Sequence, residues 1–249
     1  MDLPPDFVLY VAIGFAAQLV DGALGMAYGV TASTLLIGFG VPPAVSSATV
    51  HAAECFTTGA SALSHRAFGN IDRALFRRLL LPGMLGAAIG AYLLGSIDAD
   101  ALKPWVAGYL GLMGVLILAK SLRKAVVPKE VVRHVPLLGF VGAMLDALGG
   151  GGWGPIVASN LLLRGHAFRL TVGSVNAVEF FVTLTASAVF LLTLGTLHLW
   201  IVAALALGGV AAAPFGAWLV RFIQPTLLMR VVGVLVIALS LRTLYLALA

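Results

Sequence analysis

The stretch Asp146-Ala147-Leu148-Gly149-Gly150-Gly151-Gly152-Trp153-Gly154-Pro155 interrupts an apolar segment that extends over residues 136–163. A second stretch, Asp21-Gly22-Ala23-Leu24-Gly25-Met26-Ala27-Tyr28-Gly29, interrupts the apolar segment 7–40 in the same way. Glycine is unfavourable in the interior of a helix because it loses the most backbone freedom on folding. We therefore predict that each segment forms a hairpin, in which two half-helices are joined by an irregular turn.

The composition of the chain excludes a soluble domain. The 249 residues are 61% hydrophobic and only 10% charged, with a mean hydropathy of +1.06. Soluble domains carry about 25% charged residues. We predict an integral membrane protein whose net charge of +5 reflects its orientation in the bilayer and not a nucleic-acid partner. The single cysteine, Cys55, excludes an intrachain disulfide, and no motif calls for a cofactor.

Apolar segments long enough to cross a bilayer define the predicted domain organisation. A helical span needs about 20 apolar residues. The predicted fold is an all-α polytopic membrane protein with two inverted-topology repeats, each a broken-helix hairpin followed by three transmembrane helices. The first repeat, 1–122, contains hairpin 7–40 and spans 42–65, 74–96 and 102–122. A cytoplasmic linker, 123–135, precedes the second repeat, 136–249, which contains hairpin 136–163 and spans 166–193, 197–221 and 226–247.

An internal repeat relates the two halves by a shift of about 125 residues, which indicates that one half is a duplicate of the other. The shift superposes lone acids as well as apolar residues, and chance similarity between apolar segments would not produce that match. The matching first-half residues are Gly14, Phe15, Asp21, Gly25, Gly29, Leu36, Gly40, Val50, Ala52, Glu54, Phe56 and Thr58. Their second-half partners are Gly139, Phe140, Asp146, Gly150, Gly154, Leu161, Gly165, Val175, Ala177, Glu179, Phe181 and Thr183.

The distribution of Lys and Arg predicts the orientation. If each broken segment returns to the side it entered, nearly all basic residues face the cytoplasm, and only Lys103 and Arg242 lie outside. A single crossing at each broken segment would place four arginines on the wrong side: Arg164, Arg169, Arg221 and Arg230. The positive-inside rule therefore favours hairpins and inverted halves. We expect both termini to be extracytoplasmic in a bacterial-type plasma (inner) membrane.

Several motifs make the chain similar to a known transporter family. The motifs are the paired Asp–Gly hairpins, the turn at 41–44, the helix segment 53–60, Phe68-Gly69-Asn70-Ile71-Asp72 and the run 149–154. Together they resemble the sulfite exporter TauE/SafE family over nearly the whole chain. The resemblance implies a secondary carrier of sulfur-containing anions such as sulfite or small organosulfonates, and it implies export. The first hairpin departs from the family by carrying Met26, Ala27 and Tyr28 in place of glycines.

The hairpin tips are the predicted substrate site. Inverted repeats with broken helices place substrate where half-helix ends meet, and unpaired amides with a positive helix dipole suit an oxyanion. The alternative is a purely structural role, in which the glycines only permit tight turns or close helix packing. The candidate substrate-binding residues are Gly25, Tyr28, Gly29, His51, Gly150, Gly151, Gly152, Trp153, Gly154 and Asn176.

The only acids inside the predicted spans are Asp21, Glu54, Asp146 and Glu179. Each ionised acid at the bilayer centre costs about 2.5–3.5 kcal/mol, so all four must lie away from lipid. Asp21 and Asp146 begin the irregular turns, where a carboxylate could cap the following half-helix. Glu54 and Glu179 are the candidates for proton coupling or site support.

Two polar trios set these glutamates apart. His51-Glu54-Thr58 and Asn176-Glu179-Thr183 each share one helical face. A buried hydrogen-bond network and a proton-titrating, substrate-lining face are both open interpretations. We hypothesise that Glu54 or Glu179 carries the coupling proton, with help from His51.

The predicted function is proton-coupled secondary transport of a small sulfur-containing anion, with the anion held between the hairpin tips. An anion channel lined by the same hairpins is the alternative. No HExxH, nucleophile elbow or Cys/His metal spacing occurs, so we predict neither an enzyme nor a metal site. The expected partners are the anion and the lipid bilayer, and a homodimer is one option for the oligomeric state.

Overall fold

The computed structural model describes residues 6–24, 26–97, 99–122, 134–164, 166–195, 198–219 and 225–248. Within these ranges every regular element is helical, as predicted. The helices are α1 (Phe7–Leu24), α2 (Tyr28–Gly38), α3 (Pro43–Ala67), α4 (Arg73–Ser96), α5 (Ala99–Ser121), α6 (Val135–Gly149), α7 (Ser159–Leu163), α8 (Phe168–Leu194), α9 (Leu199–Leu219) and α10 (Pro225–Leu248), with a π-helical turn at Gly154–Ala158 before α7.

Both apolar segments break at their predicted positions. The first hairpin consists of α1 and α2, and Ala27 between them has a left-handed backbone with φ of 107°. The second consists of α6, the π-helical turn and α7, and α6 is followed by Gly150, whose φ is 69°. Glycine favours this left-handed conformation because it lacks a Cβ atom. The glycine-rich turns therefore divide each apolar segment into two half-helices.

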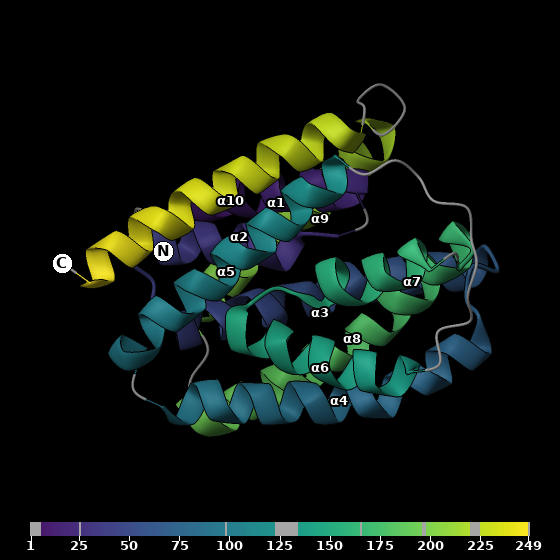
Figure 1. Cartoon of the computed structure of the whole chain (residues 1–249), viewed down its shortest axis with the longest axis horizontal. Helices are drawn as coiled ribbons and strands as arrows, with labels where there is room; N and C mark the ends of the chain where they lie inside the picture. Colours follow the sequence, from purple (N-terminus) through teal and green to yellow (C-terminus); the bar gives the residue numbers. More distant parts are fainter. Residues whose placement is uncertain are drawn as a thin grey trace.

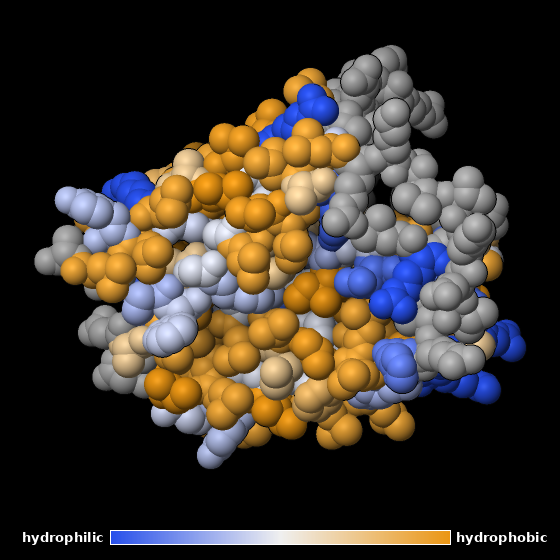
Figure 2. Space-filling view, viewed as in Figure 1, coloured by the Kyte–Doolittle hydropathy of each residue, from blue (hydrophilic) through white to orange (hydrophobic). Residues whose placement is uncertain are grey.

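Four helices have the length and apolar character of membrane spans: Arg73–Ser96, Ala101–Ser121, Leu170–Leu194 and Met229–Leu246. They correspond to the predicted spans 74–96, 102–122, 166–193 and 226–247. Helix α3 is as long, but buried polar groups such as His51 and Glu54 lower its hydropathy. These spans, together with the apolar outer surface in Figure 2, indicate an integral membrane protein.

The helices of the two halves interlock. Helix α1 packs chiefly on α9, and the equivalent helix α6 packs chiefly on α4. Each hairpin therefore packs against a helix of the other half. Helices α3 and α8 cross at the centre, where Gly59 lies against the Phe180 ring and Ser61 accepts a hydrogen bond from Asn176. Cys55, further back along α3, contacts Thr183, further forward along α8. Residue numbers rise along one helix as they fall along the other, so α3 and α8 are antiparallel.

The hairpins begin at opposite ends of the molecule in Figure 1. Helix α1 begins on the left, where α10 ends, whereas α6 begins and α7 ends on the right. The two turns meet in the interior, between the crossing pair α3–α8 and the pair α5–α10. This arrangement surrounds the junction of the hairpins with helices from both halves.

Candidate functional site

The tips of the two hairpins touch through their backbones. A Cβ atom on Gly29 would lie 2.9 Å from both the carbonyl oxygen of Gly150 and the Cα atom of Gly151. A Cβ atom on Gly154 would lie 2.7 Å from the Cβ atom of Met26. Such distances leave no room for a side chain, so glycine is required at these positions for the close approach. Gly25, also predicted to belong to this site, lies outside the described residues.

Each tip is held by an aspartate in the same way. An oxygen of the Asp21 carboxyl group accepts a hydrogen bond from the amide of Tyr28 at 3.3 Å. Asp146 accepts the corresponding bond from the amide of Trp153 at 3.0 Å. The partners are seven residues apart in both hairpins, and the two pairs are related by the 125-residue shift of the repeat. Each aspartate therefore binds a backbone amide at the start of the returning half-helix of its own hairpin.

Asp146 also connects its hairpin to the other half of the protein. Its second carboxyl oxygen lies 3.1 Å from Nε2 of His51 on α3, and the His51 ring is completely buried. On the opposite side of the ring, Nδ1 lies 2.8 Å from the backbone carbonyl of Ser47. Asn176, which the repeat aligns with His51, instead donates a hydrogen bond to Ser61 at 3.1 Å. Of these two aligned residues, His51 therefore contacts the aspartate of the facing hairpin, whereas Asn176 bonds to a residue of α3.

All four intramembrane acids gather around the tips. Glu54 is 4% exposed, and one of its carboxyl oxygens lies 3.2 Å from the position of a Cβ atom on Gly29. Its carboxyl group interacts electrostatically with those of Asp146, Glu179 and Asp21. Glu179 interacts in turn with Asp21 and Asp146. Acids that lie up to 158 residues apart in the sequence therefore form one cluster, which we call the acid cluster.

The two predicted trios are less connected than their spacing suggests. The Thr58 hydroxyl donates to the backbone carbonyl of Glu54 at 2.6 Å, and not to its carboxyl group. The Thr183 hydroxyl donates to the backbone carbonyl of Phe180 at 3.0 Å. These threonines satisfy their hydrogen bonds within their own helices, which leaves the glutamate carboxyl groups for other partners.

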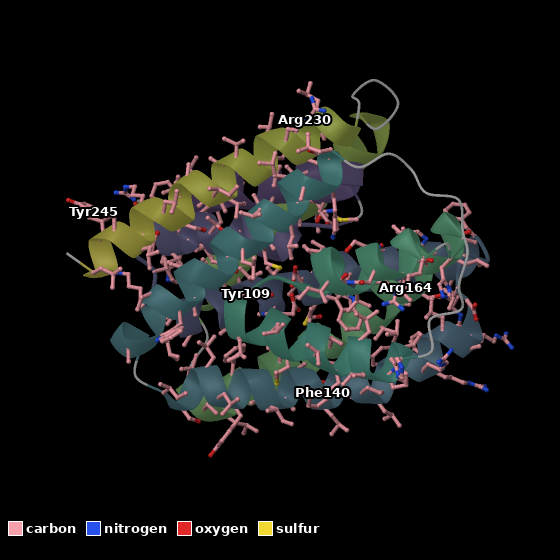
Figure 3. All side chains as sticks on the ribbon, viewed as in Figure 1. Tyr109, Phe140, Arg164, Arg230 and Tyr245 are labelled. Carbon is pink, nitrogen blue, oxygen red and sulfur yellow. The ribbon has the colours of Figure 1, made fainter. Side chains whose placement is uncertain are left out.

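Three hydroxyl groups that sequence reasoning did not single out as site residues support the second tip. The Ser33 hydroxyl donates to the carbonyl of Gly150 at 2.5 Å, and Ser47 donates to that of Ala147 at 2.6 Å. Tyr109, labelled in Figure 3 beside the bend after α6, donates to the carbonyl of Gly151 at 2.9 Å. The last carbonyls of a helix have no partner within the helix. Hydroxyls from α2, α3 and α5 therefore supply the missing donors, and no local sequence signal identifies them.

Lys120, one of the basic residues predicted to face the cytoplasm, also contacts this hairpin. The Lys120 ammonium group, near the end of α5, donates to the carbonyl of Pro155 at 2.5 Å and to the hydroxyl of Ser159. Both acceptors belong to the returning arm of the second hairpin. A π-helical turn displaces backbone carbonyls from the regular α-helical pattern. Lys120 therefore stabilises the irregular part of this arm from another helix.

The predicted aromatic residues turn their rings away from the tips. Trp153 is completely buried, and its ring nitrogen donates to the carbonyl of Val175 at 3.2 Å. The Tyr28 hydroxyl lies 3.5 Å from the carbonyl of Leu205. Both residues therefore offer the tips only their backbone, and their amides are taken by the aspartates.

No group of three or more metal-ligating side chains is found in the described ranges. The polar chemistry of the centre is instead that of carboxyl groups, one imidazole and backbone amides.

These features define a class of protein. Broken-helix hairpins that meet inside a helical membrane protein are the arrangement used by secondary transporters to bind solutes. The chain belongs to the sulfite exporter TauE/SafE family, whose model matches residues 10–243. It is also similar to the "Probable membrane transporter protein YtnM" of Bacillus subtilis (strain 168), with 42% identity over 248 residues, covering 95% of this chain and 82% of that protein. No solved structure matches the chain.

The comparisons confirm the family predicted from the sequence motifs, and they identify the chain as a membrane transporter. They are consistent with a protein that is not an enzyme, since both names describe transport. The role of each candidate residue at the hairpin tips stays a prediction.

Proposed function

We propose that this protein is a secondary transporter that exports a small sulfur-containing anion, of the sulfite or organosulfonate class, across the plasma membrane. The observation that carries the proposal is the backbone contact between Gly29 and the Gly150–Gly151 segment, made inside the acid cluster. The family model supports the substrate class by its description as a sulfite exporter. The anion would bind between the tips and become accessible from alternate sides as the hairpins move.

An inverted relationship between the repeats is part of this proposal. Helices α3 and α8 are equivalent by the 125-residue shift, yet they cross in antiparallel directions. A two-fold axis along the membrane normal would leave equivalent helices parallel, so the antiparallel crossing supports an axis in the membrane plane. The exchange of partners between α1–α9 and α6–α4 supports the same axis. With the basic residues inside, both termini would be extracytoplasmic.

The tips have donors suited to an oxyanion. The backbone amides of Val30 and Gly154 lie at the start of the returning arm of each hairpin, where the helix dipole is positive. A tetrahedral or pyramidal oxyanion could accept from both arms at once if the tips separated slightly. The present contact between the tips would then correspond to a closed arrangement of the hairpins.

The acid cluster supports the involvement of protons in transport. Ionised carboxylates would repel an anion, whereas protonated carboxyl groups can donate hydrogen bonds to it. Glu54 faces Gly29 directly, and Glu179 shares the same cluster. We therefore assign the coupling proton to these glutamates, with the His51–Asp146 pair as a neighbouring proton acceptor.

Flux measurements with the purified protein in proteoliposomes test the proposal. The substrate panel comprises sulfite, thiosulfate, organosulfonates and carboxylates, each with and without an imposed pH gradient. We expect saturable flux of a sulfur-containing anion that responds to the gradient and loses that response in Glu54→Gln or Glu179→Gln. Asp6→Asn, a change at an exposed acid before α1, is the control and should behave as the unmodified protein.

Two results would contradict parts of the proposal. Flux that ignores the gradient, with both glutamate variants active, would remove proton coupling. Ohmic single-channel currents in place of saturable exchange would favour the anion channel formed by the same hairpins.

A further inference from the structure

A cavity lies away from the hairpin tips, between the second half of α3, the first turn of α4 and the middle of α8. Its volume is about 420 Å³, within the range of roughly 300–1,000 Å³ typical of ligand pockets. The residues used below are Ala62, Leu63, Arg66, Phe76, Phe180 and Phe181. We call this cavity the α3–α8 groove. None of the four acids of the acid cluster lines it.

The groove opens on the outer surface of the protein. Leu63 on its wall is 70% exposed, and Arg66 at the end of α3 is exposed as well. Phe180 follows Glu179 directly on α8, and consecutive residues of a helix point about 100° apart. The phenylalanine therefore faces the groove while the glutamate faces the acid cluster. A molecule in the groove would reach it from the bilayer and not from the transport site.

The lining combines one cation with an aromatic wall. The Phe181 ring makes edge-to-face contacts with two neighbours, at centroid distances of 6.0 Å to Phe76 and 5.2 Å to Phe180. Arg66 is the single charged residue of the lining. Within the described residues no carboxylate forms an ion pair with Arg66. This charge therefore remains available to an anionic group from outside the chain.

The surroundings of the groove add further positive charge. Helix α4 begins at Arg73, and the exposed residues Arg73 and Arg77 flank Phe76 in the sequence. Hydrophilic residues gather at the right-hand end of Figure 2, which contains the corner between α3 and α4. Basic pockets between transmembrane helices on the cytoplasmic side are sites for anionic lipid headgroups. The apolar wall below such a headgroup suits an acyl chain.

We propose that the α3–α8 groove binds an anionic phospholipid, with the phosphate on Arg66 and an acyl chain against Phe76, Phe180 and Phe181. The inference rests on the cavity, its exposure and its charge, and it holds whatever solute the protein transports. The groove uses the same two helices that carry Glu54 and Glu179, so a bound lipid also supports the central crossing of α3 and α8.

Native mass spectrometry of the detergent-purified full chain tests this assignment. The protein is incubated with equal amounts of phosphatidylglycerol and phosphatidylcholine, and the lipid adducts are counted. We expect a preference for phosphatidylglycerol that falls about tenfold in Arg66→Gln, because the variant loses a charge-assisted contact to the phosphate. Ala62→Phe, which fills the groove, should reduce adducts of both lipids. The matched controls are Arg230→Gln and Ala203→Phe, at exposed positions on α10 and α9.

Thermal unfolding of each variant in the same detergent separates loss of lipid from loss of fold. Variants that unfold within a few degrees of the unmodified chain while losing phosphatidylglycerol support the proposal. Equal lipid binding by Arg66→Gln and Arg230→Gln would overturn it. A dimer that Ala62→Phe dissociates without changing lipid adducts would also overturn it, since the groove would then be an interface with a second copy.

Discussion

Substituting Gly151 by alanine tests the contact on which the arrangement of the hairpins depends. A Cβ atom at this position would lie 2.1 Å from the amide nitrogen of Val30 and 2.6 Å from its Cα atom. Because carbon atoms attract best at about 3.5–4.0 Å, the tips would have to move apart by about 1 Å. Overpacking of a well-packed interior destabilises by about 1–3 kcal/mol. We expect Gly151→Ala to lower the free energy of unfolding by this amount.

Gly108→Ala is the matched control for this change. Gly108 also lies in a helix of the same membrane domain, but a Cβ atom there would meet no atom within 4 Å. The control therefore adds the same methyl group without a clash, and it should be neutral or slightly stabilising because alanine is the better helix former. Thermal unfolding in detergent and anion flux in proteoliposomes are measured for both variants.

The reciprocal variant, Gly29→Ala, tests the same contact from the first hairpin. Gly29→Ala places a methyl group on the other side of the same contact, 2.9 Å from Gly151. Once one alanine has separated the tips, the second meets less resistance, so the two destabilisations should add to less than their sum. Full additivity, or a Gly151→Ala variant that unfolds and transports like Gly108→Ala, would refute the idea that direct backbone contact joins the hairpins.

Three further changes test the polar supports of the tips. His51→Ala removes the partner of buried Asp146 and should lower the free energy of unfolding by about 3 kcal/mol. Asn176→Ala, at the partly exposed equivalent position, should lower it by less. Equal losses of stability in thermal unfolding would contradict the asymmetry between the repeats. Lys120→Met should destabilise the protein by about 2 kcal/mol, because it removes charge-assisted hydrogen bonds to the second hairpin. Amide hydrogen exchange in that hairpin should increase, and unchanged exchange would refute the contact. Ser33→Ala leaves the carbonyl of Gly150, after the end of α6, without its donor and should destabilise the protein by about 1–3 kcal/mol. An unchanged midpoint of thermal unfolding would contradict this prediction.

Much of the architecture could be predicted from local sequence features. Hydropathy identifies membrane helices because each residue of a span meets lipid independently of distant contacts. Glycine runs identify the breaks because backbone conformation is a local property, and Gly150 adopts the predicted kind of irregular turn. The amide bonds of Asp21 and Asp146 are equally local, since each carboxyl group accepts from an amide only seven residues away.

The sequence by itself thus determined a helical membrane protein with two duplicated, broken-helix halves and the family to which it belongs. Only the tertiary structure decided that Gly29 meets Gly151, that His51 reaches Asp146 across 95 residues, and that Ser33 and Lys120 hold the second hairpin. A hydroxyl or ammonium group has no local preference for one distant carbonyl over another. Its partner is fixed by how whole helices dock, and that depends on the combined packing of both halves.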